Sequence, residues 1–149
     1  MNKANGFPQL FLRLALGVGF LLPVMDRLGI LGAPGSPDVA WGNWENFTIY
    51  TNSLMPVLNK SMAGVMGLIA TMAEIVFGIC LILGFKTRLA AIGSALLTFT
   101  FAICMMLSSG IYAPFKYPVF VFTGGGLVLW GLNYYKWSID AAITTAKRK

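Results

Sequence analysis

The chain has 149 residues, of which 57% are hydrophobic and only 11% are charged, and its net charge is +6. A soluble domain carries about a quarter charged residues, and a small domain cannot keep so much apolar surface away from water. The composition therefore excludes an ordinary soluble domain and predicts an integral membrane protein with a single membrane domain, residues 1–149.

Four continuously apolar stretches are long enough to cross a bilayer as helices, which takes about 20 residues each. They are residues 7–31, 62–85, 89–107 and 115–135. The first is too long for the core of a signal peptide. The second and third are joined by a short turn around Gly84 and Thr87, which makes them antiparallel neighbours. We therefore predict an all-α four-helix bundle with up-down-up-down topology.

The first outer loop, residues 32–61, contains a predicted short helix. Ser36 and Pro37 are a typical helix start, and aromatic residues follow at helical spacing. These are Trp41, Trp44, Phe47 and Tyr50. The pattern favours a helix lying at the membrane interface, and the alternative is an irregular loop packed over the bundle. A short helix is also expected in the tail, residues 136–149.

The basic residues predict the orientation, because Lys and Arg concentrate on the cytoplasmic side. The side that carries both termini holds Lys3, Arg13, Lys86, Arg88, Lys136, Lys147, Arg148 and Lys149. The other side holds Arg27, Lys60 and Lys116. Both termini are therefore expected in the cytoplasm, as in a multi-pass protein of the cell inner membrane. This bias explains the net charge without a nucleic-acid partner.

Glu74 is an acid in the middle of the second apolar stretch, where an ionised carboxylate needs a partner or water. Arg13, inside the first stretch, is the basic residue expected nearest to it by depth. We predict that Arg13 and Glu74 form a pair between two helices. Such a pair is either part of a ligand, quinone or proton site, with these two residues as catalytic candidates, or a structural link.

Asp26 and Arg27 follow Pro23 near the outer end of the first helix. Pro23 is expected to kink the helix and open the outer mouth of the bundle, where Asp26 and Arg27 are ligand-binding candidates. The alternative for Arg27 is an anchor whose charged end reaches the interface. Gly125, within the "TGGG" of the fourth stretch, is a further ligand-binding candidate, although tight helix packing equally accounts for it.

The missing residue types exclude several chemistries. The chain has no histidine, so we expect no bis-histidine haem and no zinc or other metal site. Neither a P-loop nor a dinucleotide-binding glycine motif is present. Cys80 and Cys104 are expected at very different depths, and no CxxC motif occurs, which argues against a thiol-relay enzyme.

The segment "AEIVFGICLILGFKTRLAAIGSALL", residues 73–97, resembles the DoxX/DoxD family of small four-helix membrane proteins. The matching positions are Ala73, Glu74, Gly78, Gly84, Thr87, Arg88, Leu89, Ala90 and Ala91. The first helix adds Arg13, Leu14, Gly17, Phe20 and the triplet Asp26, Arg27 and Leu28. Many members carry a histidine in the third helix, and its absence here puts histidine-dependent redox chemistry in doubt.

The resemblance implies an inner-membrane bundle and two candidate functions. One is a subunit of an oxidoreductase complex that couples to quinone through the intramembrane Arg/Glu site. The other is a non-catalytic accessory or assembly subunit of a larger complex. In both, the expected partners are the lipid bilayer and another protein subunit or a second copy of the chain. A small transporter is disfavoured, because neither repeats nor interrupted helices are evident.

Overall fold

The computed structural model describes residues 6–146, and every regular element in this range is a helix. The helices are α1 (Phe7–Arg27), α2 (Trp44–Leu54), α3 (Lys60–Leu83), α4 (Thr87–Ser109), α5 (Ala113–Lys116), α6 (Val119–Trp130) and α7 (Ile139–Ala146). Three of them, α1, α3 and α4, are long and apolar enough to cross a membrane. The predicted all-helical membrane class is therefore confirmed.

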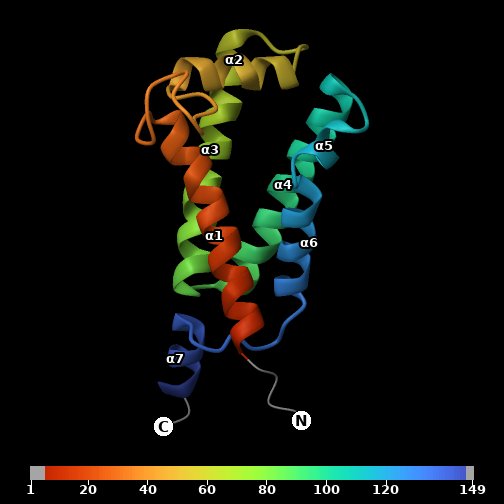
Figure 1. The fold of residues 1–149 in the computed structure, drawn as a ribbon. Coiled ribbons are helices and arrows are strands. Elements are labelled where there is room, and N and C mark those ends of the chain that lie inside the picture. Colours follow the sequence, from red (N-terminus) through yellow and green to blue (C-terminus); the bar gives the residue numbers. More distant parts are fainter. Residues whose placement is uncertain (1–5, 147–149) are drawn as a thin grey trace.

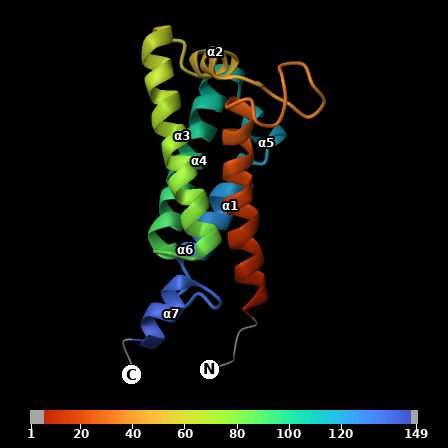
Figure 2. The same ribbon diagram turned by 90° about the vertical axis from the view of Figure 1, so that its left-hand side faces the viewer.

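The helices form two packed pairs, α1 against α3 and α4 against α6, which diverge toward the α2 end (Figure 1). Helix α2 lies across one end of the bundle, and α7 lies at the opposite end, close to the start of α1 (Figures 1 and 2). Four of the basic residues used above to predict the orientation are Lys3, Lys147, Arg148 and Lys149, and these lie outside the described residues.

Small residues allow the two helix pairs to approach closely. A Cβ atom added at Gly17 of α1 would lie 2.8 Å from the carbonyl oxygen of Gly78 in α3. A Cβ atom added at Gly126 of α6 would lie 2.9 Å from the carbonyl oxygen of Ala91 in α4. Close backbone contact at such crossings is typical of membrane helices. The buried core between the pairs consists of Leu16, Phe20, Leu81, Ala90, Ala91 and Leu129.

The outer surface of the bundle is strongly apolar. Val121, Leu68 and Leu96 expose 71%, 52% and 61% of their surface, although each lies within a helix. Contact of such apolar side chains with water is unfavourable, whereas contact with lipid acyl chains is favourable. The surface therefore agrees with the composition: the apolar residues that this small fold cannot bury face outward.

The turn between α3 and α4 is tight, as predicted, and it holds α7. Gly84 ends α3 with φ of +68°, a conformation that glycine adopts without strain. Asp140 of α7 accepts hydrogen bonds from the backbone N–H groups of Lys86 and Thr87, both at 2.8 Å. Its own N–H donates to the Gly84 carbonyl at 3.0 Å. Asp140 thereby supplies the side-chain cap for the start of α4.

The fourth apolar stretch forms a shorter helix than the predicted span of residues 115–135. Helix α6 has 12 residues, which is about 18 Å of helix. Pro118, which cannot donate a backbone hydrogen bond, precedes its first residue, and Gly131 follows its last. The stretch before it forms only the single turn of α5. A continuous apolar run therefore does not make a continuous helix here.

The predicted short helix of the first outer loop exists, but its predicted start at Ser36 and Pro37 is wrong. Helix α2 begins at Trp44, after Asn43, whose side chain accepts a hydrogen bond from the Asn46 N–H at 2.8 Å. The segment before it is irregular, with positive φ at Asp38 and Gly42. A helix cannot run through such residues, so the two predicted alternatives, a helix and an irregular loop, each describe one half of the segment.

Candidate functional site: a buried ion pair under an aromatic roof

The charged centre of the bundle is an ion pair between Arg27 and Glu74. The Arg27 Nη1 atom lies 2.7 Å from Glu74 Oε2, and both side chains are almost fully buried. Arg27 is the last residue of α1, whereas Glu74 lies near the middle of α3. A buried acid is tolerated when an opposite charge and hydrogen bonds replace water. Arg27 supplies the opposite charge.

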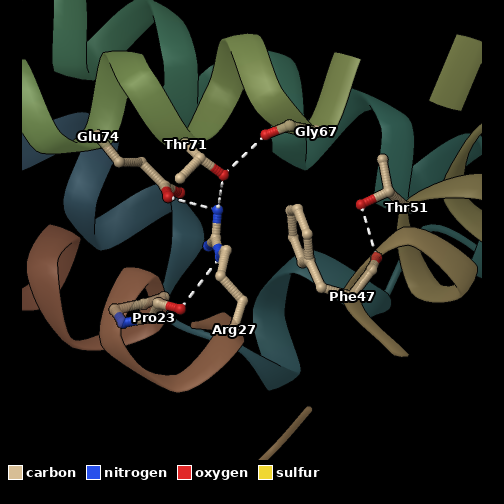
Figure 3. Close-up of polar contacts among 7 residues, drawn as sticks. All are labelled: Pro23, Arg27, Phe47, Thr51, Gly67, Thr71 and Glu74. Atoms are coloured by element: carbon tan, nitrogen blue, oxygen red, sulfur yellow. Dashed lines mark hydrogen bonds and ion pairs between the residues drawn. The ribbon is translucent and has the colours of Figure 1, made fainter. Parts of the chain in front are cut away.

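Hydrogen bonds fix the position of the Arg27 guanidinium (Figure 3). Its Nη1 donates to Thr71 Oγ1 at 2.8 Å, and Thr71 in turn donates to the Gly67 carbonyl at 2.7 Å. Its Nε donates to the carbonyl of Pro23, one turn back in α1, at 3.0 Å. Thr71 and Glu74 lie on the same stripe of α3, so one guanidinium contacts both.

Two aromatic rings cover the pair from the side of α2. The guanidinium carbon of Arg27 lies 4.0 Å from the centre of the Phe47 ring and 5.4 Å from the Trp41 ring. Gly67 makes room for Phe47, because a Cβ atom there would lie 2.9 Å from its ring. We call Phe47 and Trp41 the aromatic roof. Their electron-rich faces stabilise the cation while excluding water.

Asp26 holds the roof in place and does not face an open mouth. Its two carboxylate oxygens accept hydrogen bonds from the backbone N–H groups of Ala40, Trp41 and Gly42, the shortest at 2.8 Å. Asp26 is buried, with 5% of its surface exposed. This contact ties the loop to the end of α1 and sets Trp41 beside Arg27. Pro23 lies inside α1, which continues to Arg27, and the kink expected there stays a prediction.

The predicted pairing of Arg13 with Glu74 is wrong. Arg13 is fully buried at the other end of α1, where it binds backbone carbonyls instead. Its Nε donates to Leu81 at 3.0 Å and its Nη2 to Ile82 at 3.2 Å, at the end of α3. Longer bonds, each 3.4 Å, reach Lys136 and Trp137. Arg13 therefore joins the end of α3 to the segment that leads into α7.

The expectation that Arg27 reaches the interface as an anchor is also wrong, because only 2% of its surface is exposed. Helix α3 extends past the end of α1, and α2 covers the extension (Figure 2). Side chains on a helix lean toward its N-terminus. Arg27 therefore leans back along α1, toward Glu74, whereas Arg13 leans away from it. This directional rule could have selected the correct arginine from the sequence.

Gly125 lies at a packed contact. A Cβ atom there would lie 3.2 Å from Leu12 Cδ1 and 3.4 Å from Leu16 Cδ1, both on α1. This is the tight-packing alternative that the sequence left open. Nearby, Thr98 of α4 and Thr123 of α6 share a hydrogen bond of 2.9 Å. Neither threonine was expected to pair, although their depth and small size allow it.

The sequence did not assign roles to several residues of the site. Phe47 and Trp41 were expected at the interface, not over a cation, and nothing in the pattern indicated that Asp140 would cap α4. Asp26 and Asp140 had no partner that the sequence could reveal, because each accepts hydrogen bonds from backbone N–H groups of a distant segment. Within residues 6–146, no cluster of three or more metal-binding side chains occurs.

The site retains some capacity to bind or to exchange a proton. Within the described residues, Arg27 Nη2 donates no hydrogen bond, and Glu74 Oε2 receives none despite its ion contact with Nη1. An arginine has five N–H donors, and a carboxylate accepts several bonds. The arrangement can therefore hold one more oxygen atom at the guanidinium and a proton at Glu74 Oε1, since Oε2 faces the guanidinium.

The fold and the site define a helical membrane protein whose central helices are joined by a buried Arg–Glu pair. A family comparison agrees with this class: the DoxX family model matches residues 8–108. The chain belongs to the DoxX family. The match includes both members of the ion pair and Arg13, and it ends within α4. No curated protein and no solved structure matches the chain.

Proposed function

We propose that this DoxX-family chain is a membrane subunit of an oxidoreductase complex that couples to quinone at the Arg27–Glu74 pair. The observation that carries the proposal is a buried carboxylate at 2.7 Å from a guanidinium. Intramembrane ionisable groups are costly, and they most often serve substrate or proton pathways. In this proposal Arg27 replaces Arg13 as the basic partner of Glu74.

The residues present suit a quinone head group in two respects. The unused Nη2 donor of Arg27 would hold a carbonyl oxygen, and the aromatic roof would lie along a flat ring. A quinone, when bound, would accept two electrons and two protons. Glu74 would hold one of these protons at Oε1, because Oε2 lies 2.7 Å from the Arg27 guanidinium. A partner subunit would have to supply the electrons.

The proposal also includes the finer topology. Helix α6 would be the fourth span, extended by its flanking residues, in an up-down-up-down bundle. Both termini would lie in the cytoplasm and the protein in the cell inner membrane, because Lys86, Arg88 and Lys136 lie near the α7 end. Labelling of single cysteines with a membrane-impermeant reagent tests this: a cysteine at position 116 should react from outside, and one at position 86 should not.

The functional test is thiosulfate-dependent quinone reduction in membranes that contain the chain, because the resemblance to the DoxX/DoxD family implies a subunit of a thiosulfate:quinone oxidoreductase. We expect expression to raise the rate, and Glu74→Gln to lower it about 10-fold or more, as the loss of a general acid or base does. Glu45→Gln is the matched control, because Glu45 is exposed and forms an ion pair with Lys60 at 3.5 Å, away from Arg27 and Glu74. An unchanged rate on expression, or an unaffected Glu74→Gln variant, would remove the support for this function.

A second candidate is an accessory subunit that assembles or stabilises a larger complex. It is favoured by the number of elements that meet at Arg27, which contacts α1, α2 and α3. In this function the pair sets helix register and α2 is a docking surface. Copurification distinguishes the candidates: a stoichiometric partner, together with normal activity of its complex after Glu74→Gln, would favour the accessory role.

A further inference from the structure

A second site lies at the α2 end of the molecule, away from the ion pair. A pocket of about 350 Å³ lies between the second half of α2, the end of α4 and the short α5. The side chains that define it are those of Tyr50, Met105, Ser109, Tyr112, Lys116 and Tyr117. It therefore combines three phenols, a hydroxyl and an ammonium group, with Met105 as its apolar floor.

The pocket offers hydrogen-bond donors and a positive charge, and its lining contains no carboxylate. Within residues 6–146, Lys116 makes no salt bridge, and the hydroxyl groups of Tyr50 and Tyr117 make no hydrogen bond. Burial raises the pKa of Tyr50, and the neighbouring Tyr117 raises it further. Tyr50 therefore stays protonated near neutral pH and can act as a donor.

The pocket opens beside apolar surface. Leu107 on α4, Ile111 in the following turn and Phe115 on α5 expose 83%, 59% and 68% of their surface. A tyrosine-rich, lysine-bearing border next to such residues is typical of the level of lipid head groups. An occupant of this pocket would thus place an anionic head among the donors and an apolar tail along α4 and α5.

We propose that this pocket binds the phosphate of an anionic phospholipid. Phosphate oxygens accept charge-assisted hydrogen bonds, which Lys116 and the tyrosine hydroxyl groups can donate. The acyl chains would lie against Leu107 and Phe115. The proposal does not depend on the oxidoreductase function, since no residue of the ion pair lines the pocket.

The pocket is connected to the ion pair through neighbouring aromatic rings. Tyr50 lies 5.5 Å from Trp41, measured between ring centroids, and Trp41 lies 5.4 Å from the Arg27 guanidinium. Tyr50 lies on α2, so a lipid bound to Tyr50 contacts the helix that carries Phe47 of the aromatic roof. Lipid binding in the pocket would therefore influence the position of α2.

Native mass spectrometry of the purified chain tests the proposal, with phosphatidylglycerol and phosphatidylcholine of identical acyl chains as probes. We expect preferential retention of phosphatidylglycerol, weakened about 10-fold by Lys116→Gln, as expected for loss of a hydrogen bond to a charged group. Lys60→Gln is the matched control, because Lys60 is also exposed but lies outside the pocket. Helix content measured by circular dichroism verifies that each variant is folded.

The outcomes separate the sources of the phosphate. Displacement of the lipid by millimolar inorganic phosphate would overturn the lipid assignment and identify a site for soluble phosphate. Equal retention of the two lipids, or equal weakening by Lys116→Gln and Lys60→Gln, would overturn the site altogether. If Lys116→Gln does not fold, Tyr117→Phe serves instead, and it should weaken retention several-fold through loss of one donor.

Discussion

The two arginines of α1 are buried to the same extent but have opposite surroundings. Among the described residues, Arg13 donates hydrogen bonds only to neutral backbone carbonyls, at the end of α3 and before α7. Arg27 meets a carboxylate, a threonine hydroxyl and two aromatic faces. The difference teaches that burial of a charged side chain does not by itself indicate a functional site. The kind of partner indicates whether a buried charge is structural or functional. Arg13 binds carbonyls at a helix end, which need hydrogen-bond donors in any protein.

The largest effect is expected from breaking the Arg27 pair. Glu74→Gln or Arg27→Gln leaves one charge buried without its partner and should lower the free energy of unfolding by about 3–5 kcal/mol. The double variant should lose less than the sum of the single losses, because neither charge remains. Denaturant unfolding in micelles measures this coupling. Additive losses would show that the two residues act independently.

A smaller loss is expected for Arg13→Met, about 2–3 kcal/mol, since it removes a charged donor from several carbonyls but leaves no buried charge unpaired. Proteolysis should then begin in residues 131–138, because Arg13 contacts the carbonyls of Lys136 and Trp137. The fragment masses identify the cleavage sites. If Arg13→Met proves as costly as Glu74→Gln, the contrast between the two arginines fails.

The crossing of α1 and α3 sets the register of both arginines and is tested by Gly17→Ala. The added Cβ would lie 2.8 Å from the Gly78 carbonyl oxygen, so we expect a loss of about 1–3 kcal/mol. Gly124→Ala is the control, because a Cβ there has no atom within 4 Å. Thermal unfolding of the two variants compares them. Equal melting temperatures would show that the crossing is loose.

The smallest effect is expected from Asp140→Ala, which removes the cap of α4 at the Arg13 end. The loss should be about 1 kcal/mol, typical of an N-cap. Hydrogen exchange at Lys86 and Thr87 measures it locally, since their N–H groups lose their acceptor. Glu45→Ala should leave these two rates unchanged. Exchange rates that do not rise in Asp140→Ala would show that water replaces the cap.

The sequence predicted the three long helices well, because each is a continuous apolar run. The turn at Gly84 marks the boundary between α3 and α4. The fourth helix, Val119–Trp130, is shorter than the predicted stretch, since hydrophobicity alone treats the run through Pro118 as unbroken. It identified Glu74 as the central acid but paired it with the wrong arginine. That step needs the relative register of α1 and α3, which depends on the Gly17–Gly78 contact and on the lean of side chains along a helix.

The position of Arg27 at the very end of α1 has a consequence for biogenesis. The chain is synthesised from its N-terminus, so Arg27 enters the membrane before Glu74 exists. At the end of an apolar helix its guanidinium can stay hydrated at the bilayer surface during this interval. An arginine in the middle of the helix could not stay hydrated in this way. When α3 is inserted later, Glu74 can pair with the Arg27 guanidinium, and α2 then covers the pair.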